Sequence, residues 1–270
     1  MITAGIDVGI ENVKVVILED GKAIGRSKGR SGGWKRLAAT ETALGEALRD
    51  AGKTAGDVSR TVATGKGKFD VASIAGDVIT EPVAALKAAQ FLCQEVTTVV
   101  DVGADETLVA SVNEKGRIEQ LVINEKCAAG VGSFLRNMAR RLELSLADMD
   151  GLPPVAPDGS TVSDGCIVFG ELDALNLLNN GVSAKEVASA VTASAVIRVT
   201  NSINDITVPR LDKVVLLGGL TKNTAFVKAL NARSKIEFAI PEDAEYGGAL
   251  GAALYAAGWG DSYYMENKTA

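Results

Sequence analysis

The stretch that decides the fold is residues 2–25, ITAGIDVGIENVKVVILEDGKAIG, together with a second copy of its pattern at residues 97–123, TTVVDVGADETLVASVNEKGRIEQLVI. Each begins with an apolar run, turns at an Asp-x-Gly (Asp7–Gly9 and Asp101–Gly103), and continues into further strand-like sequence. Apolar runs separated by short turns that carry Gly and Asp predict consecutive antiparallel strands. Two copies of one supersecondary unit indicate a duplication, and two similar lobes with a cleft between them are its natural product.

Helical segments are expected between and after the two copies. Apolar spacing predicts a helix over about 34–50, followed by a short strand at 60–65 and a helix over about 81–94. Further predicted elements are helices at about 129–142, 168–180 and 183–204, a strand at 213–217 and a final Ala- and Gly-rich helix at 247–258. We expect one lobe over residues 1–97, joined by the C-terminal helix 246–258, and a second lobe over residues 98–245.

The composition of the 270-residue chain excludes several classes of protein. It is 47% hydrophobic with a mean hydropathy of +0.16, which suits a buried core and not a disordered chain. A net charge of −6 without a basic run argues against nucleic-acid binding. No stretch nears the roughly 20 apolar residues of a membrane span, and the start of the chain lacks the pattern of a secretory signal. We therefore expect a cytoplasmic protein with no nucleic-acid or membrane partner.

The chain has no histidine and only three cysteines, Cys93, Cys127 and Cys166. The lack of histidine excludes Ser-His-Asp triads, imidazole general bases and His-containing zinc sites. An odd, sparse set of cysteines in a cytosolic chain does not form a disulfide framework.

The two Asp-x-Gly turns are candidates for phosphate binding. A glycine in a tight turn lets backbone N–H groups approach a phosphate closely. An aspartate at the end of the preceding strand can hold Mg²⁺ through water or orient an attacking water. A single Asp-x-Gly is as consistent with an ordinary turn, whereas two copies at matching places favour the functional interpretation. Gly218–Gly219 lies between an apolar strand and a helical stretch, where backbone amides could face a nucleotide or simply form a turn.

Two of the cysteines suit ligation of a metal cluster. Cys127 and Cys166 both lie just ahead of a predicted helix, where free amides favour a thiolate, although each could instead be a small buried residue. Cys93 lies on an apolar helix face and is expected to pack there. Because a [4Fe–4S] cluster or a closed zinc site needs about four ligands, a cluster would need two chains, each donating Cys127 and Cys166 across a two-fold axis.

These features resemble a known superfamily. The two hairpins, Gly218–Gly219 before a late helix, and the GALGAA run at 248–253 resemble the actin-like and sugar-kinase ATPases. More narrowly, NEKCAAGVGSFL at 124–135 and GCIVFGEL at 165–172 resemble the two cysteine motifs of ATP-dependent activators of 2-hydroxyacyl-CoA dehydratases. They equally resemble the motifs of the related ATPase subunits of benzoyl-CoA reductase. The resemblance spans residues 2–257 and implies an α/β protein with the duplicated two-lobe fold and a nucleotide cleft between the lobes.

The resemblance also implies a function. It implies a dimer, of this chain or with a homologous ATPase subunit, that holds one [4Fe–4S] cluster through Cys127 and Cys166 of each chain. Hydrolysis of ATP with Mg²⁺ would drive a low-potential electron from this cluster to an iron–sulfur dehydratase or reductase component. The cluster would be sensitive to oxygen, which fits an anaerobic metabolism. A ferredoxin or flavodoxin would be the donor.

The residues that the resemblance assigns fall into three groups. Asp7, Asp101 and Asp105 are the catalytic candidates. The nucleotide-binding candidates are Gly9, Asn12 and Lys14 of the first hairpin, Gly103 of the second, Gly130 and Gly132 at the helix after Cys127, and Gly218, Gly219 and Asn223 on the adenosine side. Cys127 and Cys166 are the cluster ligands.

The chain departs from the family pattern in four places. Ile10 replaces a usual hydroxyl residue, and Ala104–Glu106 replaces Gly-Gln-Asp, which leaves open which acidic residue orients the attacking water. The stretch TEPVAALKAA at 80–89 replaces a His-containing one, and Gly170–Asp173 replaces Ala-Glu-Ser-Glu. Two other functions therefore stay open: a small-molecule kinase of the same fold, which would not need the two cysteines, and a non-catalytic nucleotide-binding scaffold.

Overall fold

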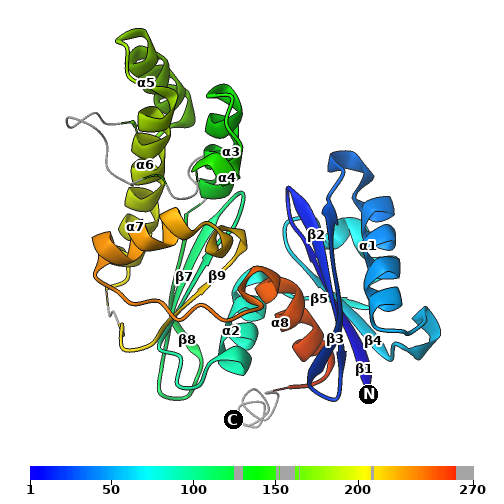
Figure 1. Cartoon of the computed structure of the whole chain (residues 1–270). Coiled ribbons are helices and arrows are strands. Elements are labelled where there is room, and N and C mark those ends of the chain that lie inside the picture. The colour runs from blue at the N-terminus through cyan, green and yellow to red at the C-terminus, as the bar shows by residue number, and fades with distance from the viewer. Residues whose placement is uncertain (125–129, 150–151, 153–161, 164, 208–209, 260–270) are drawn as a thin grey trace. The chain divides into compact units, whose positions relative to one another are not determined.

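Two separate β-sheets organise the chain, as Figure 1 shows. The computed structural model describes residues 1–124, 130–149, 152, 162–163, 165–207 and 210–259. The chain divides into two compact units. Unit 1 comprises residues 1–96, 112–118 and 241–270, and unit 2 comprises residues 97–111 and 119–240.

The sheet of unit 1 has the strand order β3-β2-β1-β4-β5. Its strands are β1 (Ile2–Val8), β2 (Asn12–Glu19), β3 (Lys22–Arg30), β4 (Arg60–Thr64) and β5 (Asp77–Val78). Strands β1 to β3 form the predicted antiparallel hairpins, and β4 then pairs in parallel with β1. Helix α1 (Arg36–Asp50) makes the crossover that a parallel return from β3 to β4 requires.

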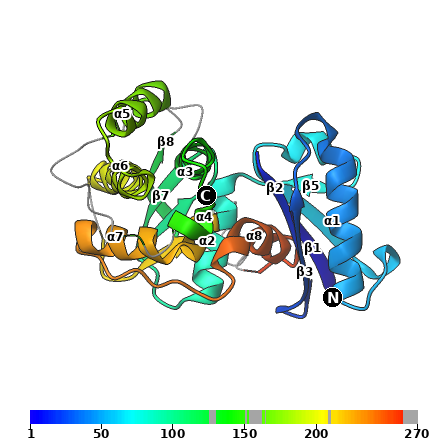
Figure 2. The same cartoon turned by 45° about the horizontal axis from the view of Figure 1, so that its top comes forward.

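Helices cover both faces of this sheet, as Figure 2 shows for α1 and for α8 (Gly247–Ala256). Side chains alternate along β1, so Ala4, Ile6 and Val8 join a core cluster with apolar residues of α1. Gly5 faces α8, where a Cβ atom would lie only 1.9 Å from the carbonyl oxygen of Ala249. The lack of a side chain at Gly5 therefore lets α8 pack directly on the sheet. The even-numbered face supplies core, and the odd-numbered face, which includes Asp7, meets α8.

Helix α8 makes a second close contact within unit 1, with α2 (Glu81–Leu92). A Cβ atom on Gly251 would lie 1.9 Å from the carbonyl oxygen of Ala84. The small residues of the GALGAA run thus explain how one helix packs against both a strand and another helix.

The sheet of unit 2 has the strand order β8-β7-β6-β9. Its strands are β6 (Thr98–Val102), β7 (Thr107–Val112), β8 (Ile118–Asn124) and β9 (Val214–Leu217). As in unit 1, the central strand has an antiparallel hairpin partner on one side and a parallel partner on the other. The helices are α3 (Val131–Arg141), α4 (Leu146–Met149), α5 (Ile167–Asn179), α6 (Ala184–Asn204) and α7 (Thr224–Ser234). Phe134, Val191 and Phe226 from three of them join the strand residues in one core.

The predicted helices and strands are confirmed, with ends shifted by a few residues. The structure adds short elements that the pattern did not predict: β5, α4, and the 3₁₀ helices η1 (Gly33–Lys35), η2 (Ala55–Asp57), η3 (Lys68–Val71), η5 (Gly219–Lys222) and η6 (Ala244–Tyr246). Cys93 is only partly buried and ends α2 as its C-cap, so it lies past the apolar helix face where we expected it. Among the helices of the described ranges, none has the length and apolarity to cross a membrane.

Candidate functional site

The two Asp-x-Gly turns close in the same way. The N–H of Gly9 donates to the carbonyl oxygen of Asn12 (3.0 Å), and the N–H of Gly103 donates to that of Glu106 (2.9 Å). In each hairpin the aspartate is the second-last residue of the first strand. The repeat seen in the sequence is therefore also a repeat of backbone geometry.

In each unit, a glycine lies against the aspartate of the hairpin. This glycine directly follows the strand that pairs in parallel with the first strand of the hairpin. Gly65 follows β4 with φ of +89°, and Gly218 follows β9 with φ of +97°. A Cβ atom would lie 2.7 Å from Oδ1 of Asp7 at Gly65, and 2.6 Å from Oδ1 of Asp101 at Gly218. Both sites thus need glycine for its conformation and for its lack of a side chain beside the carboxylate. Sequence analysis singled out Gly218 and missed Gly65, although Gly65 also directly follows an apolar strand.

The side chains next to the two aspartates differ. Asp7 is paired in register with Lys14 of β2 and Thr64 of β4. Asp101 occupies the matching place between Leu108 and Leu217. The strand neighbours of the aspartate are therefore polar in unit 1 and apolar in unit 2. The two aspartates are not chemically equivalent.

The carboxylate of Asp7 lies in a crowded polar environment. Its side chain is 20% exposed, and Nζ of Lys14 lies 3.8 Å from its Oδ2 atom. Burial raises the pKa of Asp7, the positive charge of Lys14 opposes that rise, and the negative charge of Glu81 adds to it. Gly248 of α8 leaves room for this group, since a Cβ atom there would lie 2.9 Å from Oδ2.

Glu81 and Lys68 are site residues that sequence reasoning missed. Nζ of Lys68 lies 3.3 Å from Oε2 of Glu81 and donates to the carbonyl oxygen of Gly65 (3.2 Å). Thr64 is 1% exposed, and its Oγ1 atom has no hydrogen-bond partner among the described residues. The Gly65–Lys68 turn, GKGK, was the available signal, because Gly and Lys after a strand are typical of phosphate sites. Asp7 beside Lys14, together with Lys68 and Glu81 at the neighbouring turn, supplies the amines and carboxylates that can hold a phosphate and its magnesium ion.

The second hairpin is bonded to the N-terminus of α3. The N–H of Gly132 donates to the carbonyl oxygen of Gly103 (3.1 Å), and the N–H of Ser133 donates to that of Ala104 (3.0 Å). A Cβ atom would lie 2.2 Å from the carbonyl carbon of Asp105 at Gly130, and 2.8 Å from the oxygen of Gly103 at Gly132. The turn and the helix are therefore in direct backbone contact, and Asp105 lies at that contact.

The residues predicted to face the adenosine lie just ahead of helix α7. Gly218 and Gly219 connect β9 to the 3₁₀ helix η5, and Asn223 is the N-cap of α7. Oδ1 of Asn223 accepts from the N–H of Phe226 (2.7 Å), which leaves its side-chain NH₂ as a donor. Asn223 thus has a structural role that does not prevent a contact with a ligand.

Cys166 is the N-cap of α5, as its place before a predicted helix suggested. The backbone N–H groups of Phe169 and Val168 donate to its sulfur and lower its pKa, and the positive charge of Arg198 lowers it further. A partly exposed thiol with a lowered pKa fits a ligand of an iron–sulfur cluster. Cys127 lies outside the described residues, and within the described ranges no group of three or more Cys, Asp and Glu side chains is arranged to hold a metal.

The paired hairpins, their glycines and the helix-capping cysteine agree with one family of ATPases. The sequence profile of the BadF/BadG/BcrA/BcrD ATPase family matches residues 4–256. The chain belongs to this family. The matched range runs through both units and covers both hairpins and both cysteine motifs of this chain.

Two relatives of this family member align with nearly its whole length. It is 37% identical to the activator of lactoyl-CoA dehydratase of Anaerotignum propionicum, over 95% of this chain and 97% of that protein. It is 31% identical to a benzoyl-CoA reductase subunit of Thauera aromatica, over 95% of this chain and 93% of that protein. Both halves of the expected resemblance, to activators and to reductase subunits, are therefore confirmed.

Solved structures confirm the fold. The activator of the 2-hydroxyisocaproyl-CoA dehydratase from Clostridium difficile with bound ADPNP has a TM-score of 0.86 and 27% identity, covering 100% of this chain and 98% of that one. A ROK-family glucokinase from Streptomyces griseus has a TM-score of 0.59 at 13% identity, over 95% and 99%, which shows the shared fold alone. The family member thus has the actin-like and sugar-kinase ATPase fold that the sequence predicted.

The structure places the predicted site residues in three groups. Unit 1 holds the first hairpin with Asp7, Gly9, Asn12 and Lys14. Unit 2 holds the second hairpin together with the glycines of α3 and the Gly218 turn. Cys166 also lies in unit 2, as the N-cap of α5.

Proposed function

We propose that this chain is an ATP-hydrolysing iron–sulfur protein. In this proposal, hydrolysis drives one low-potential electron from a dimer-bridging [4Fe–4S] cluster to a 2-hydroxyacyl-CoA dehydratase. The observation that carries the proposal is the pair of hydrogen bonds from the start of α3 to Gly103 and Ala104. They connect a phosphate-binding turn to the helix that follows Cys127, as ATP-driven movement of a cluster would require.

ATP is bound in this proposal by the amides of the two glycine hairpins. The ADPNP complex of the related activator supports this choice of nucleotide. Lys14 and Lys68 would neutralise phosphate charge, and Asp7 would hold the water shell of Mg²⁺. Asp101 and Asp105 are the further candidates to orient the attacking water, and the helix-capping turn at Gly218, Gly219 and Asn223 would face the adenosine.

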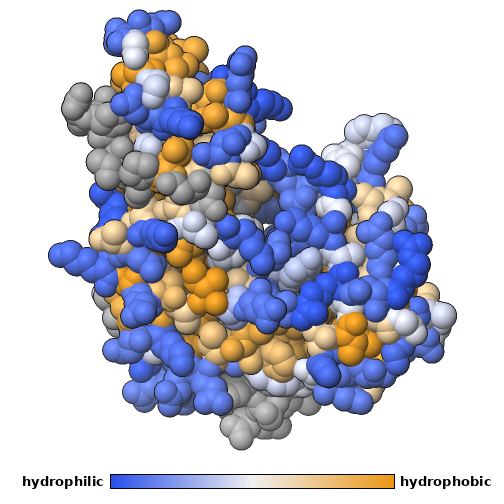
Figure 3. Space-filling view, viewed as in Figure 1, coloured by the Kyte–Doolittle hydropathy of each residue, from blue (hydrophilic) through white to orange (hydrophobic). Residues whose placement is uncertain are grey.

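Two chains would hold one cluster through Cys127 and Cys166 of each. When bound, the cluster supplies a site for one transferable electron. The position of Cys166 at a helix start supports this role, and so does the surface of α5. Four large apolar side chains project from that helix, at 51–68% exposure: Val168, Phe169, Leu172 and Leu175. They contribute to the hydrophobic surface at the α5 end of unit 2 in Figure 3. Apolar surface next to the ligand favours association there, with a second copy of the chain as the occupant.

A benzoyl-CoA reductase ATPase subunit is the second candidate, because of the 31% identity to the reductase subunit of Thauera aromatica. In that case the dimer partner would be a homologous chain, and a reductase component would accept the electron. A ferredoxin or flavodoxin is the expected donor in both cases. A small-molecule kinase shares only the fold with this chain and gives no reason for the lowered thiol pKa of Cys166.

Anaerobic purification with iron and sulfide analysis tests the proposal. About four irons per two chains are expected, with iron lost in Cys127→Ala and in Cys166→Ala while the protein stays folded. Cys93→Ala is the matched control and should keep its iron, because Cys93 is a helix C-cap remote in sequence from both motifs. Electron delivery to a purified dehydratase, dependent on ATP, completes the test. A colourless monomer without iron would refute the proposal, and a requirement for a co-expressed homologous subunit would favour the reductase.

A further inference from the structure

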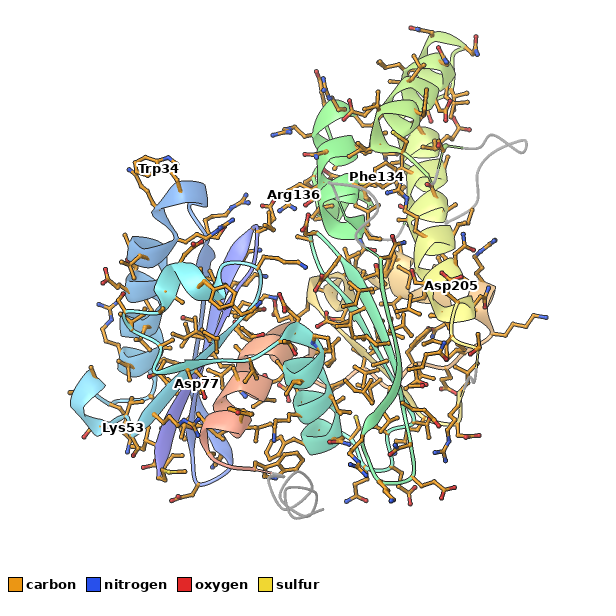
Figure 4. The ribbon with its side chains drawn as sticks, turned by 180° about the vertical axis from the view of Figure 1, so that it is seen from behind. Trp34, Lys53, Asp77, Phe134, Arg136 and Asp205 are labelled. Atoms are coloured by element: carbon orange, nitrogen blue, oxygen red, sulfur yellow. The ribbon has the colours of Figure 1, made fainter. Side chains whose placement is uncertain are left out.

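The first hairpin site contains a buried hydroxyl group that makes no hydrogen bond. Thr64, the last residue of β4, is 1% exposed, and its Oγ1 atom has no partner among the described residues. Strand β4 lies inside the sheet, between β1 and β5, whose Asp77 is labelled in Figure 4. Leaving a buried hydroxyl unbonded costs free energy, and a valine of similar shape would avoid that cost. Thr64 therefore carries a polar group for which the fold alone gives no use.

The side chain beside Thr64 on β1 also lacks a hydrogen bond. Thr64 and Asp7 are paired in register in the parallel strands β4 and β1, so their side chains lie on the same face of the sheet. The contact of Asp7 with Nζ of Lys14 is 3.8 Å long, beyond hydrogen-bond distance, and no other described residue bonds to the carboxylate. A hydroxyl and a carboxylate are thus neighbours, and both can still accept hydrogen bonds.

The residues around this pair have no side chain with which to complete the bonds. A Cβ atom at Gly65 would lie 2.7 Å from Oδ1 of Asp7, and one at Gly248 would lie 2.9 Å from Oδ2, so neither position can hold a larger residue. Lys68 and Glu81 already pair with each other (3.3 Å), and Lys68 also donates to the carbonyl oxygen of Gly65 (3.2 Å). The partner of the two open groups is therefore one that the chain itself does not supply.

Hydrated Mg²⁺ is the ligand whose chemistry fits both groups. Mg²⁺ keeps several of its water molecules when it binds nucleotide phosphates, and these waters are hydrogen-bond donors. A carboxylate and a hydroxyl oxygen can both accept from them. A phosphate oxygen fits less well in direct contact with Thr64, because the negative charge of Asp7 on the neighbouring strand would repel it.

We propose that Thr64 is a positioning residue for nucleotide that carries Mg²⁺: its hydroxyl oxygen accepts a hydrogen bond from a water molecule of the ion, while Asp7 holds the same hydration shell from the next strand. The inference rests on the proposed function for the binding of ATP with Mg²⁺, and it adds a residue outside both Asp-x-Gly turns and both cysteine motifs. Two acceptors on adjacent strands fix the orientation of the hydrated ion better than a single carboxylate does. Thr64 thereby contributes to affinity only when the nucleotide carries the metal.

Calorimetric titration of the anaerobically purified protein with ADPNP, once with excess Mg²⁺ and once with EDTA, tests this role. Thr64→Val keeps the shape of the side chain and removes the hydroxyl, so it should weaken binding about tenfold with Mg²⁺ and by less than about twofold with EDTA. Thr64→Ser keeps the hydroxyl and should bind within about threefold of the wild type in both conditions. A loss of less than about twofold in Thr64→Val with Mg²⁺, or equal losses with and without Mg²⁺, would overturn the inference.

Ser111→Ala is the matched control. Ser111 is 0% exposed, and its Oγ atom likewise has no partner within the described ranges. It pairs in register with Thr98, at the end of the β6–β7 pair that is remote from the Asp101 turn. Ser111→Ala should therefore change nucleotide affinity by less than about twofold in both conditions. A loss with Mg²⁺ as large as that of Thr64→Val would mean that any buried hydroxyl has this effect, and the assignment would fail.

Urea unfolding without nucleotide gives a readout that does not depend on binding. Because Thr64 makes no hydrogen bond within the fold, Thr64→Val should unfold at the same urea concentration as the wild type or at a higher one. A lower midpoint would show that the hydroxyl is bonded inside the protein and would overturn the inference.

The same measurements separate this inference from the proposed cluster. A wild type without iron whose affinity with Mg²⁺ still depends on Thr64 refutes the cluster function alone. A wild type whose binding of ADPNP does not respond to Mg²⁺ overturns the role of Thr64, whether or not the protein holds iron.

Discussion

Replacement of Gly132 by alanine tests the contact between the second hairpin and α3. An added Cβ atom would lie 2.8 Å from the carbonyl oxygen of Gly103 and 3.0 Å from Cα of Ala104. Both are backbone atoms that cannot rotate away, so the turn and the helix must separate. Overpacking of this kind costs about 1–3 kcal/mol. Each of the two hydrogen bonds at the contact contributes about another 0.5–1.5 kcal/mol. Against these losses, alanine gains at most about 1 kcal/mol in helix propensity.

The expected net effect is a loss of roughly 1–5 kcal/mol in the free energy of unfolding, because the steric and hydrogen-bond losses exceed the propensity gain. Gly45, in α1, is the matched control, since a Cβ atom there meets nothing within 4 Å. Gly45→Ala should therefore stabilise the protein by about 0.5–1 kcal/mol. Urea unfolding of both variants with the wild type measures the difference.

The same variant tests the coupling. In Gly132→Ala, the spectrum of the reduced cluster should respond less to exchange of ADP for ATP, because the turn is no longer bonded to the helix. Gly45→Ala should respond as the wild type does. A Gly132→Ala protein that is as stable as Gly45→Ala and keeps the full nucleotide response would refute the reasoning.

Three further predictions concern the hairpins and a helix cap. Asp7→Asn and Asp101→Asn should each lower ATP turnover, measured by phosphate release, by about two orders of magnitude, because positioning of Mg²⁺ and water carries most of phosphoryl-transfer catalysis; unchanged turnover in both would reject the phosphate role. The raised pKa of Asp7 means that the folded chain favours the protonated carboxyl, so ionisation lowers wild-type stability as the pH rises from 3.8 through the folded pKa. Asp7→Asn should therefore be more stable relative to the wild type at pH 7 than below pH 3.8, as chemical unfolding at both pH values would show. Ser183→Ala should lower the free energy of unfolding by about 1 kcal/mol, since its hydroxyl caps α6 by accepting from Glu186; the exposed Thr42→Ala should stay within about 0.5 kcal/mol.

The local pattern of apolar and turn residues was sufficient to predict most of the helices and strands. The apolar runs of β1, β2, β6 and β9 are short and are followed by turns that carry Gly or Asp, and α6 repeats apolar residues at helical spacing. Cys166 was predicted ahead of a helix and is its N-cap. These features depend on neighbours a few residues apart, so one sequence contains the needed information.

The same local pattern could not predict contacts between segments that are distant in the sequence. Gly5 needs to be glycine because residue 249 approaches it, and Gly248 because Asp7 does. Glu81 was noted only as part of a departure from the family pattern, and its effect on Asp7 depends on where α2 begins relative to β1. Nothing in the local sequence shows such proximity.

The sequence by itself determined the duplicated hairpins, the helix start at Cys166 and the family, because hydrophobic period and turn chemistry act over a few residues. Tertiary structure alone decided that Asp7 lies between Lys14 and Thr64 while Asp101 lies between two leucines. The physical reason is that strand register and helix packing fix which side chains share a buried, low-dielectric environment, and those neighbours then set the charge state of each group.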